Sequence, residues 1–200
     1  IGSGLVGSEM CIRDRDHIDK KRWLFAMYTI CFGIMVMLVF GRFLYYGKSF
    51  VGGADGLSQV APTMQYTGQY YRALLKNILQ GNLQIPMWDM SIGFGMNILQ
   101  VISFDPVYIL CSVLFVHDIA VGIAIFDMLC LYLAGIMFIA LCYNLGCNRY
   151  AALAAALAYI FNGYILNYCM AQNSFLRLFI VLPMILLGVY NCLLYTSPSP

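Results

Sequence analysis

WLFAMYTICFGIMVMLVF, residues 23–40, is an apolar run without a charged residue. With its flanks it reaches the ~20 residues that a helix needs to cross a bilayer, so we predict a first span over residues 23–45. The basic triplet Lys20–Arg22 precedes the run, and basic residues beside a span favour the cytoplasmic side. A cleaved signal peptide is the alternative, but the run is long and no small-residue cleavage site closes it. The sequence therefore predicts a membrane protein with a cytoplasmic N-terminus.

The composition of the 200 residues also favours a membrane setting. Hydrophobic residues make up 62% and charged residues 10%, against about 25% charged residues in a typical soluble domain. The net charge of +2 provides no basic surface that could follow phosphates, so nucleic-acid binding is not expected. The eight cysteines form no CxxC pair and the two histidines lie far apart, so we expect neither a disulfide framework nor a metal cluster.

Three further apolar segments are predicted to span the membrane, at residues 119–145, 150–169 and 175–190. Arg149 follows the first of these and prefers the cytoplasm, so an even number of crossings separates it from the basic N-terminus. Residues 46–118 then form one large external loop. The sequence predicts an all-α fold, a polytopic transmembrane helix bundle.

Two surface helices are predicted inside the external loop. Residues 62–80 carry apolar side chains on one helical face and polar ones on the other, with Pro62 suited to the start and Gly81 to the stop. Residues 106–116 are apolar, but about a dozen residues are too few for a span. We expect both helices to lie at the membrane surface.

The two ends of the sequence are expected to be encoded by a DNA-sequencing adapter. VGSEMCIRDR near the N-terminus back-translates as GTG GGC TCG GAG ATG TGT ATA AGA GAC AG. CLLYTSPSP at the C-terminus back-translates as TGT CTC TTA TAC ACA TCT CCG AGC CCA, its reverse complement. We therefore exclude residues 1–15 and 192–200 from the fold, keep residues 16–191, and expect the natural protein to continue beyond Asn191. Genuine disordered ends are the alternative.

Three acidic residues of the external loop are candidates for chemistry: Asp55, Asp89 and Asp105. A carboxylate at the membrane surface can act as a general base towards a hydroxyl, and a second one can orient substrate or bind a divalent ion. The alternative is that Asp55 and Asp105 are turn residues, Asp105 initiating a turn before Pro106.

Two ionisable residues are associated with the predicted spans. Asp127 falls inside the second span, where a carboxyl is costly and suggests a function, or else a structural pairing with Asn162 or Asn167. Arg177 begins the fourth span and could clamp a lipid-linked phosphate, or else extend to the interface without a specific role.

Several segments, in order, resemble the YfhO family of bacterial membrane proteins. They are GKSFVGGADGLSQVAPTMQYTGQYYRALLKNILQG, MWDMSIGFGMNILQ, FDPVYILCSVLF, AALAYIFNGYILN and FLRLFIVLPMILLGVY. That family is similar to the GT-C class of glycosyltransferases. The resemblance implies a GT-C-like bundle in the bacterial plasma membrane, of which this chain is the N-terminal part. One departure is Asn162, where the family more often has Ser.

The resemblance implies transfer of a sugar from a polyprenyl-phosphate donor to an acceptor in the cell envelope, such as a teichoic acid. Asp55, four residues before Gln59 in DGLSQ, matches the acidic base of the class. Arg177 or Arg72 would stabilise the departing lipid phosphate. The candidate substrate-binding residues are Gln59, Arg72, Trp88, Asp89, Asp105 and Arg177. The pattern selects neither a metal nor a cofactor.

Two other classes of function remain open at this point. A transporter or lipid flippase would use Asp127 as its coupling or substrate group. A non-catalytic protein of envelope assembly would need none of these carboxylates.

Overall fold

The computed structural model of the chain describes residues 3–53, 55–82 and 84–196, with side chains from Arg22 to Leu193. Its main helices are α1 (Ser3–Tyr45), α2 (Ala61–Leu79), α3 (Pro106–Leu114), α4 (Ile119–Asn144), α5 (Arg149–Ile160) and α6 (Leu176–Thr196). Strands β1 (Trp88–Asp89) and β2 (Met96–Asn97) form an antiparallel hairpin. Single helical turns occur at Gly56–Val60, Ile98–Gln100, Ile165–Cys169 and Asn173–Phe175. The predicted adapter-encoded ends fall on the outer parts of α1 and α6, and residues 1–2 and 197–200 lie outside the described residues.

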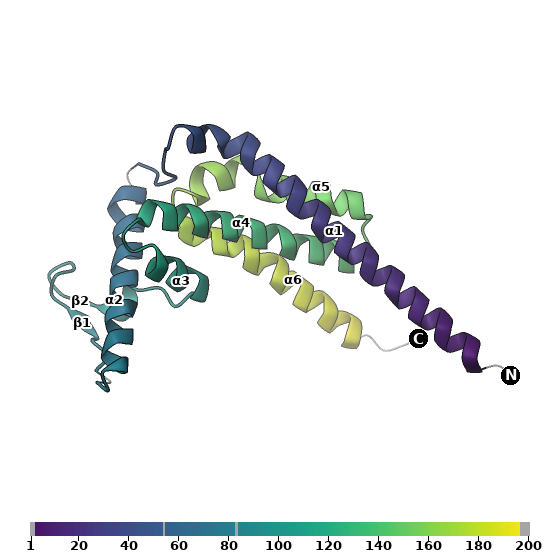
Figure 1. The fold of residues 1–200 in the computed structure, drawn as a ribbon, viewed down its shortest axis with the longest axis horizontal. Coiled ribbons are helices and arrows are strands. Elements are labelled where there is room, and N and C mark those ends of the chain that lie inside the picture. The colour runs from purple at the N-terminus through teal and green to yellow at the C-terminus, as the bar shows by residue number, and fades with distance from the viewer. Residues whose placement is uncertain (1–2, 54, 83, 197–200) are drawn as a thin grey trace.

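Helices α1, α4, α5 and α6 form a bundle in which α4 contacts both α5 and α6, while α1 crosses it (Figure 1). Within the described chain, three helical stretches are long and apolar enough to cross a membrane, Arg22–Tyr45, Ile119–Asn144 and Asn173–Leu193. They correspond to three of the predicted spans. The chain is thus an apolar helix bundle suited to a bilayer.

The predicted third span, residues 150–169, is not one continuous helix. Helix α5 ends at Ile160 after 12 residues, and a π-helical turn follows at Ile165–Cys169. Asn162 explains the break, because its amide nitrogen donates to the Tyr159 carbonyl at 2.6 Å and its oxygen accepts from the Ile165 N–H at 3.0 Å. A side chain that satisfies backbone groups in this way replaces helical hydrogen bonds. Gly163 follows directly.

A close fit between α1 and α4 lies at the centre of the bundle. Tyr28 is fully buried, and its hydroxyl donates to the Tyr132 carbonyl at 3.0 Å. The Tyr28 hydroxyl lies directly over Gly135, where even a Cβ atom would overlap it. Tyr28 and Tyr132 also stack, with ring centroids 5.4 Å apart. Glycine at position 135 therefore allows the two helices to approach.

Helices α2 and α3 and the hairpin form a surface layer that lies across the end of the bundle where α4 and α6 begin (Figure 1). Both predicted surface helices are confirmed as helices, 62–80 as α2 and 106–116 as α3. Three consecutive residues of α2 hold the layer together. Tyr70 donates to the Pro86 carbonyl at 3.1 Å, Tyr71 to the Ser103 carbonyl at 3.0 Å, and Arg72 to the Val113 carbonyl at 2.8 Å.

Gly68 brings α2 and α3 into contact. A Cβ atom at this position would overlap the backbone carbonyl of Ser112, so the two helix backbones touch there. Asp105 begins α3, since its Oδ1 accepts from the N–H groups of Val107 at 2.8 Å and Tyr108 at 3.2 Å. This is an N-cap of the kind that satisfies the free donors of a first helical turn.

Candidate functional site

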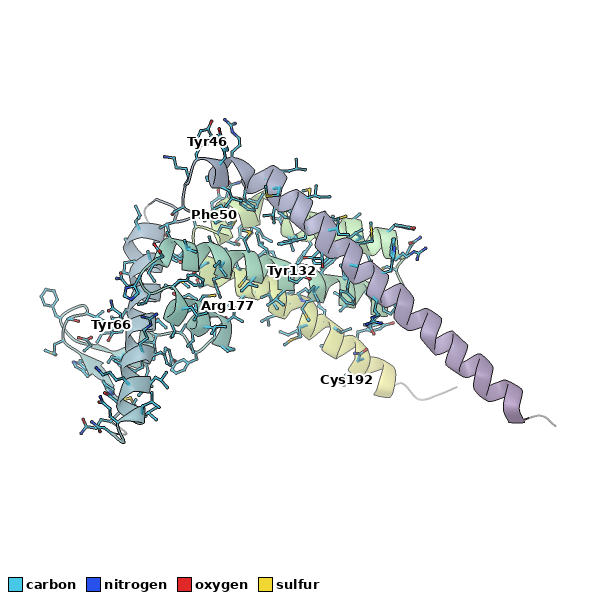
Figure 2. The ribbon with its side chains drawn as sticks, in the orientation of Figure 1. Tyr46, Phe50, Tyr66, Tyr132, Arg177 and Cys192 are labelled. Atoms are coloured by element: carbon cyan, nitrogen blue, oxygen red, sulfur yellow. The ribbon has the colours of Figure 1, made fainter. Side chains whose placement is uncertain are left out.

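A polar cavity of about 480 Å³ opens where the surface layer meets the first turn of α6. Its polar lining comes from three separate segments: Gln59 and Thr63 beside and within α2, Ser103 and Asp105 before α3, and residues 172–174 with Arg177 around the start of α6. Residues far apart in the sequence therefore meet at one end of the bundle. Figure 2 shows Arg177 at this junction.

Arg177 and Asp105 form the charged wall of the cavity. The Arg177 Nε lies 3.7 Å from Asp105 Oδ2, with 34% and 19% of the two side chains exposed. Arg177 Nη1 also donates to the Ser103 hydroxyl at 3.4 Å, and its guanidinium lies 5.6 Å from the centre of the Tyr108 ring. The arginine therefore has defined partners. Its Nε is buried and forms no hydrogen bond of good geometry with the described residues, and it faces Asp105.

Asp55 lies beside the same cavity, where it contacts the lining residue Gln172. Gln172 Nε2 lies 3.4 Å from Asp55 Oδ2 and 3.4 Å from Gln59 Oε1. Asp55 precedes the π-helical turn that carries Gln59, so the two side chains share one face. Asp55 itself is exposed. A carboxylate at the rim, reachable from solvent, and a guanidinium in the wall can act on two parts of one ligand.

Asp89 and Trp88 lie elsewhere, on the hairpin. Asp89 Oδ1 accepts from the Ser91 hydroxyl at 2.7 Å and from its N–H at 2.8 Å, and Oδ2 accepts from the Tyr66 hydroxyl at 2.7 Å. The bonds from Ser91, then that from Tyr66, lower the pKa of Asp89. Partial burial, then the bond to Asp89, raise the pKa of Tyr66 to about 12. Trp88 is 60% exposed. Neither hairpin residue lines the cavity.

Arg72 also lies away from the cavity. Besides the Val113 carbonyl, its guanidinium contacts His117 Nε2 at 3.3 Å. Arg72 therefore sits at the C-terminal end of α3, where a cation is favoured by the helix dipole, whereas Arg177 sits near the N-terminal end. Of the two arginines suggested by the sequence for a phosphate, only Arg177 lines the cavity.

Asp127 lies behind the cavity, inside α4. Its side chain is fully buried, and neither carboxyl oxygen has a hydrogen-bond partner of good geometry. The amide of Asn173, which lines the cavity, faces it. The predicted partners Asn162 and Asn167 are wrong, because Asn162 bonds to Tyr159 and Ile165 and Asn167 bonds to the Gly163 carbonyl.

The polar lining residues that sequence reasoning missed are Gln172, Asn173, Ser174, Ser103 and Thr63. The first three lie in a short polar turn, AQNSF, between two apolar segments. Its position at the same end of the bundle as the large loop is the one signal that points to a shared site. Ser103 carries no comparable signal.

Among the described side chains, no group of three or more His, Cys, Asp or Glu residues is placed to hold a metal ion. Comparison with protein-family models, with curated proteins and with solved structures found no match. The resemblance to the YfhO family stays a prediction.

Proposed function

We propose that this chain belongs to a membrane glycosyltransferase of the GT-C type, which transfers a sugar from a polyprenyl-phosphate donor to an acceptor in the bacterial cell envelope, such as a teichoic acid. The observation that carries the proposal is the joint position of Asp55 and Arg177 beside one polar cavity at an end of an apolar bundle. A lipid-linked donor would keep its chain in the bilayer and present its phosphate at the end of the bundle, where the cavity lies.

In this mechanism Asp55 acts as the general base. It removes the proton of the acceptor hydroxyl as that oxygen attacks the anomeric carbon, with inversion. The bond between the anomeric carbon and the phosphate oxygen breaks, and its electron pair leaves on the lipid phosphate. Arg177 stabilises the charge that develops there, because a guanidinium matches phosphate oxygens in a bidentate way. Gln172, which also bonds to Gln59, holds Asp55 in place.

The charge of Arg177 is shared with Asp105 until a donor binds. The phosphodiester of the donor can present two free oxygens to the guanidinium, whereas Asp105 faces it through Oδ2 alone. Asp105 is therefore a positioning residue for Arg177, and Ser103 is its second support.

The test is sugar transfer from a panel of polyprenyl-phosphate sugars in membranes that contain the protein. Asp55→Asn lowers the rate by about 10²–10⁴-fold, the usual contribution of a general base. Asp118→Asn is the matched control, since Asp118 is an exposed carboxylate outside the cavity. Full transfer by Asp55→Asn would overturn the assignment of the base.

A transporter or lipid flippase is the second candidate, favoured by Asp127, a buried carboxyl inside α4 that faces the amide of Asn173. An ionisable group inside a span is a substrate or coupling site by default. Under this alternative Asp127→Asn abolishes function while Asp55→Asn preserves it, which is the opposite of the pattern expected for the enzyme.

A further inference from the structure

An apolar groove of about 640 Å³ lies between α1 and α4, and it shares no lining residue with the polar cavity. Its walls are aliphatic and aromatic side chains of the two helices, together with Phe50 from the segment after α1. Two polar side chains, those of Lys48 and Ser49, form the rim at one end of the groove.

The groove exists because α1 and α4 diverge. The helices touch where Tyr28 lies over Gly135 and separate towards the end of α1 (Figure 1). There Gly47, with φ of +59°, ends α1: its N–H donates to the Leu44 carbonyl at 3.2 Å and that of Lys48 to the Phe43 carbonyl at 2.9 Å. This is a Schellman-type helix end that turns the chain back. Phe50 then packs on Phe40, with ring centroids 5.0 Å apart.

The length of the groove fits one membrane leaflet. Its lining runs from Phe32 to Leu44 on α1 and from Ala120 to Tyr132 on α4. Either stretch rises about 18 Å at 1.5 Å per residue. Half of the ~30 Å hydrocarbon thickness of a bilayer is about 15 Å. Figure 2 shows two of the lining residues, Phe50 near the end of α1 and Tyr132 nearer the middle of the bundle.

The two ends of the groove differ in polarity. At the inner end the Tyr132 hydroxyl is already bonded to the Thr29 hydroxyl at 2.9 Å, so it adds no free polar group. At the outer end Lys48 is exposed, and among the side chains that the structure describes no carboxylate forms an ion pair with it. The Ser49 hydroxyl accepts from the Val51 N–H at 2.9 Å and keeps its own proton for donation.

We propose that this groove binds one acyl chain of an anionic glycerophospholipid, with the lipid phosphate at Lys48 and Ser49. A single leaflet-length hydrocarbon chain fills an apolar channel of this length, and an ammonium at the rim selects a negative headgroup. A long isoprenoid chain would extend well past Tyr132, the last lining residue at that end. The proposal requires only that the bundle lies in a bilayer, and it is independent of the proposed glycosyltransferase activity.

The test is photolabelling in vesicles of equal parts phosphatidylglycerol and phosphatidylcholine. A trace of phosphatidylglycerol with a diazirine on its acyl chain is activated, and the labelled peptides are identified by mass spectrometry. The expected adducts lie on residues 32–44 and 120–132. The same probe on phosphatidylcholine gives about fivefold less label there, the factor expected for one cation at the membrane surface.

Four variants sharpen the test. Lys48→Gln lowers groove labelling by phosphatidylglycerol about fivefold, whereas Lys48→Arg retains it. Ala124→Trp fills the groove and abolishes labelling. Leu182→Trp is its matched control, because Leu182 is an exposed apolar residue of α6 outside the groove, and it leaves labelling unchanged.

Four results would overturn the proposal. Equal labelling by the phosphatidylglycerol and phosphatidylcholine probes would show that the groove does not select an anionic headgroup. Undiminished labelling of Lys48→Gln by phosphatidylglycerol would show the same. Cross-links between two chains at residues 32–44 or 120–132 in place of lipid adducts would show that a second copy covers the groove. Displacement of the label by a polyprenyl phosphate, but not by unlabelled phosphatidylglycerol, would show an isoprenoid occupant. Because Lys48 is exposed, Lys48→Gln tests the headgroup even if Ala124→Trp fails to fold.

Discussion

In the bundle, helices meet mainly through the fit of apolar and aromatic surfaces, such as the rings of Phe138 and Tyr159, whose centroids lie 4.4 Å apart, and Tyr28 adds one bond to the Tyr132 carbonyl. In the surface layer, Tyr70, Tyr71 and Arg72 instead bond to three backbone carbonyls of other segments. Apolar fit follows from hydropathy, but a bond from a side chain to a distant carbonyl does not. The two regions should therefore respond to different substitutions.

The largest effect is expected at Gly68, where the layer has its closest backbone contact. Gly68→Ala places a Cβ against the Ser112 carbonyl, which cannot rotate away, so we expect a loss of up to about 3 kcal/mol from α2–α3 packing. Thermal unfolding in detergent measures it. Gly33→Ala in α1, with open space around its Cα, is the control and should be neutral or stabilising by up to about 1 kcal/mol. Equal effects at both positions would contradict the close contact.

A smaller effect is expected at Gly135 in the bundle. Gly135→Ala meets the hydroxyl and ring of the buried Tyr28, a side chain and not a backbone group, so we expect a loss of about 1–2 kcal/mol. Tyr28→Leu in the same chain should relieve most of it, because the overlapping atoms are gone. Additive losses in the double variant, measured by the same unfolding assay, would mean that the two residues do not touch.

Two substitutions of Asp105 should distinguish the contribution of the α3 cap from that of the ion pair with Arg177. Asp105→Ala removes both and should cost about 1 kcal/mol, mainly through the cap of α3. Asp105→Asn keeps an oxygen for the cap and should lose less, since a partly exposed ion pair contributes about 0–1 kcal/mol. Amide exchange at Val107 and Tyr108 reports the cap. Faster amide exchange in Asp105→Asn than in Asp105→Ala would contradict the larger contribution of the cap.

The smallest effect is the pH dependence of the hairpin. The lowered pKa of Asp89 stabilises the folded hairpin above the ordinary value of 3.8, and this contribution is lost as the pH falls through the folded pKa. The raised pKa of Tyr66 acts in the other direction: its contribution is present below 10.0 and lost as the pH rises through about 12. Trp88 fluorescence in a Trp23→Phe background should follow both changes. Tyr66→Phe should remove the alkaline change and weaken the acidic one, because the Tyr66 hydroxyl also contributes to the lowered pKa of Asp89.

Much of the fold is accessible from sequence because hydropathy and helix signals act locally. Pro62 and Gly81 mark α2 correctly, and the short run after Asp105 is a helix of nine residues. The broken third span was not predictable from hydropathy, because Asn162 is a single polar residue in an apolar run. Its effect depends on which backbone groups it bonds.

The candidate site was accessible only in part. Asp55, Gln59, Asp105 and Arg177 were identified as single residues, but Gln172 meets Asp55 across 117 positions of sequence. No local pattern encodes a pairing of that kind. The same holds for Asp127, which faces the amide of Asn173 and neither asparagine of the third segment.

The two carboxylate oxygens of Asp105 have different partners: Oδ1 accepts from the first turn of α3, and Oδ2 faces Arg177. An anion that takes the guanidinium displaces only Oδ2, so the helix start keeps its donors satisfied while the charge balance of the wall is exchanged. Under the proposed function, a negative group therefore enters and leaves the cavity while the first turn of α3 stays capped.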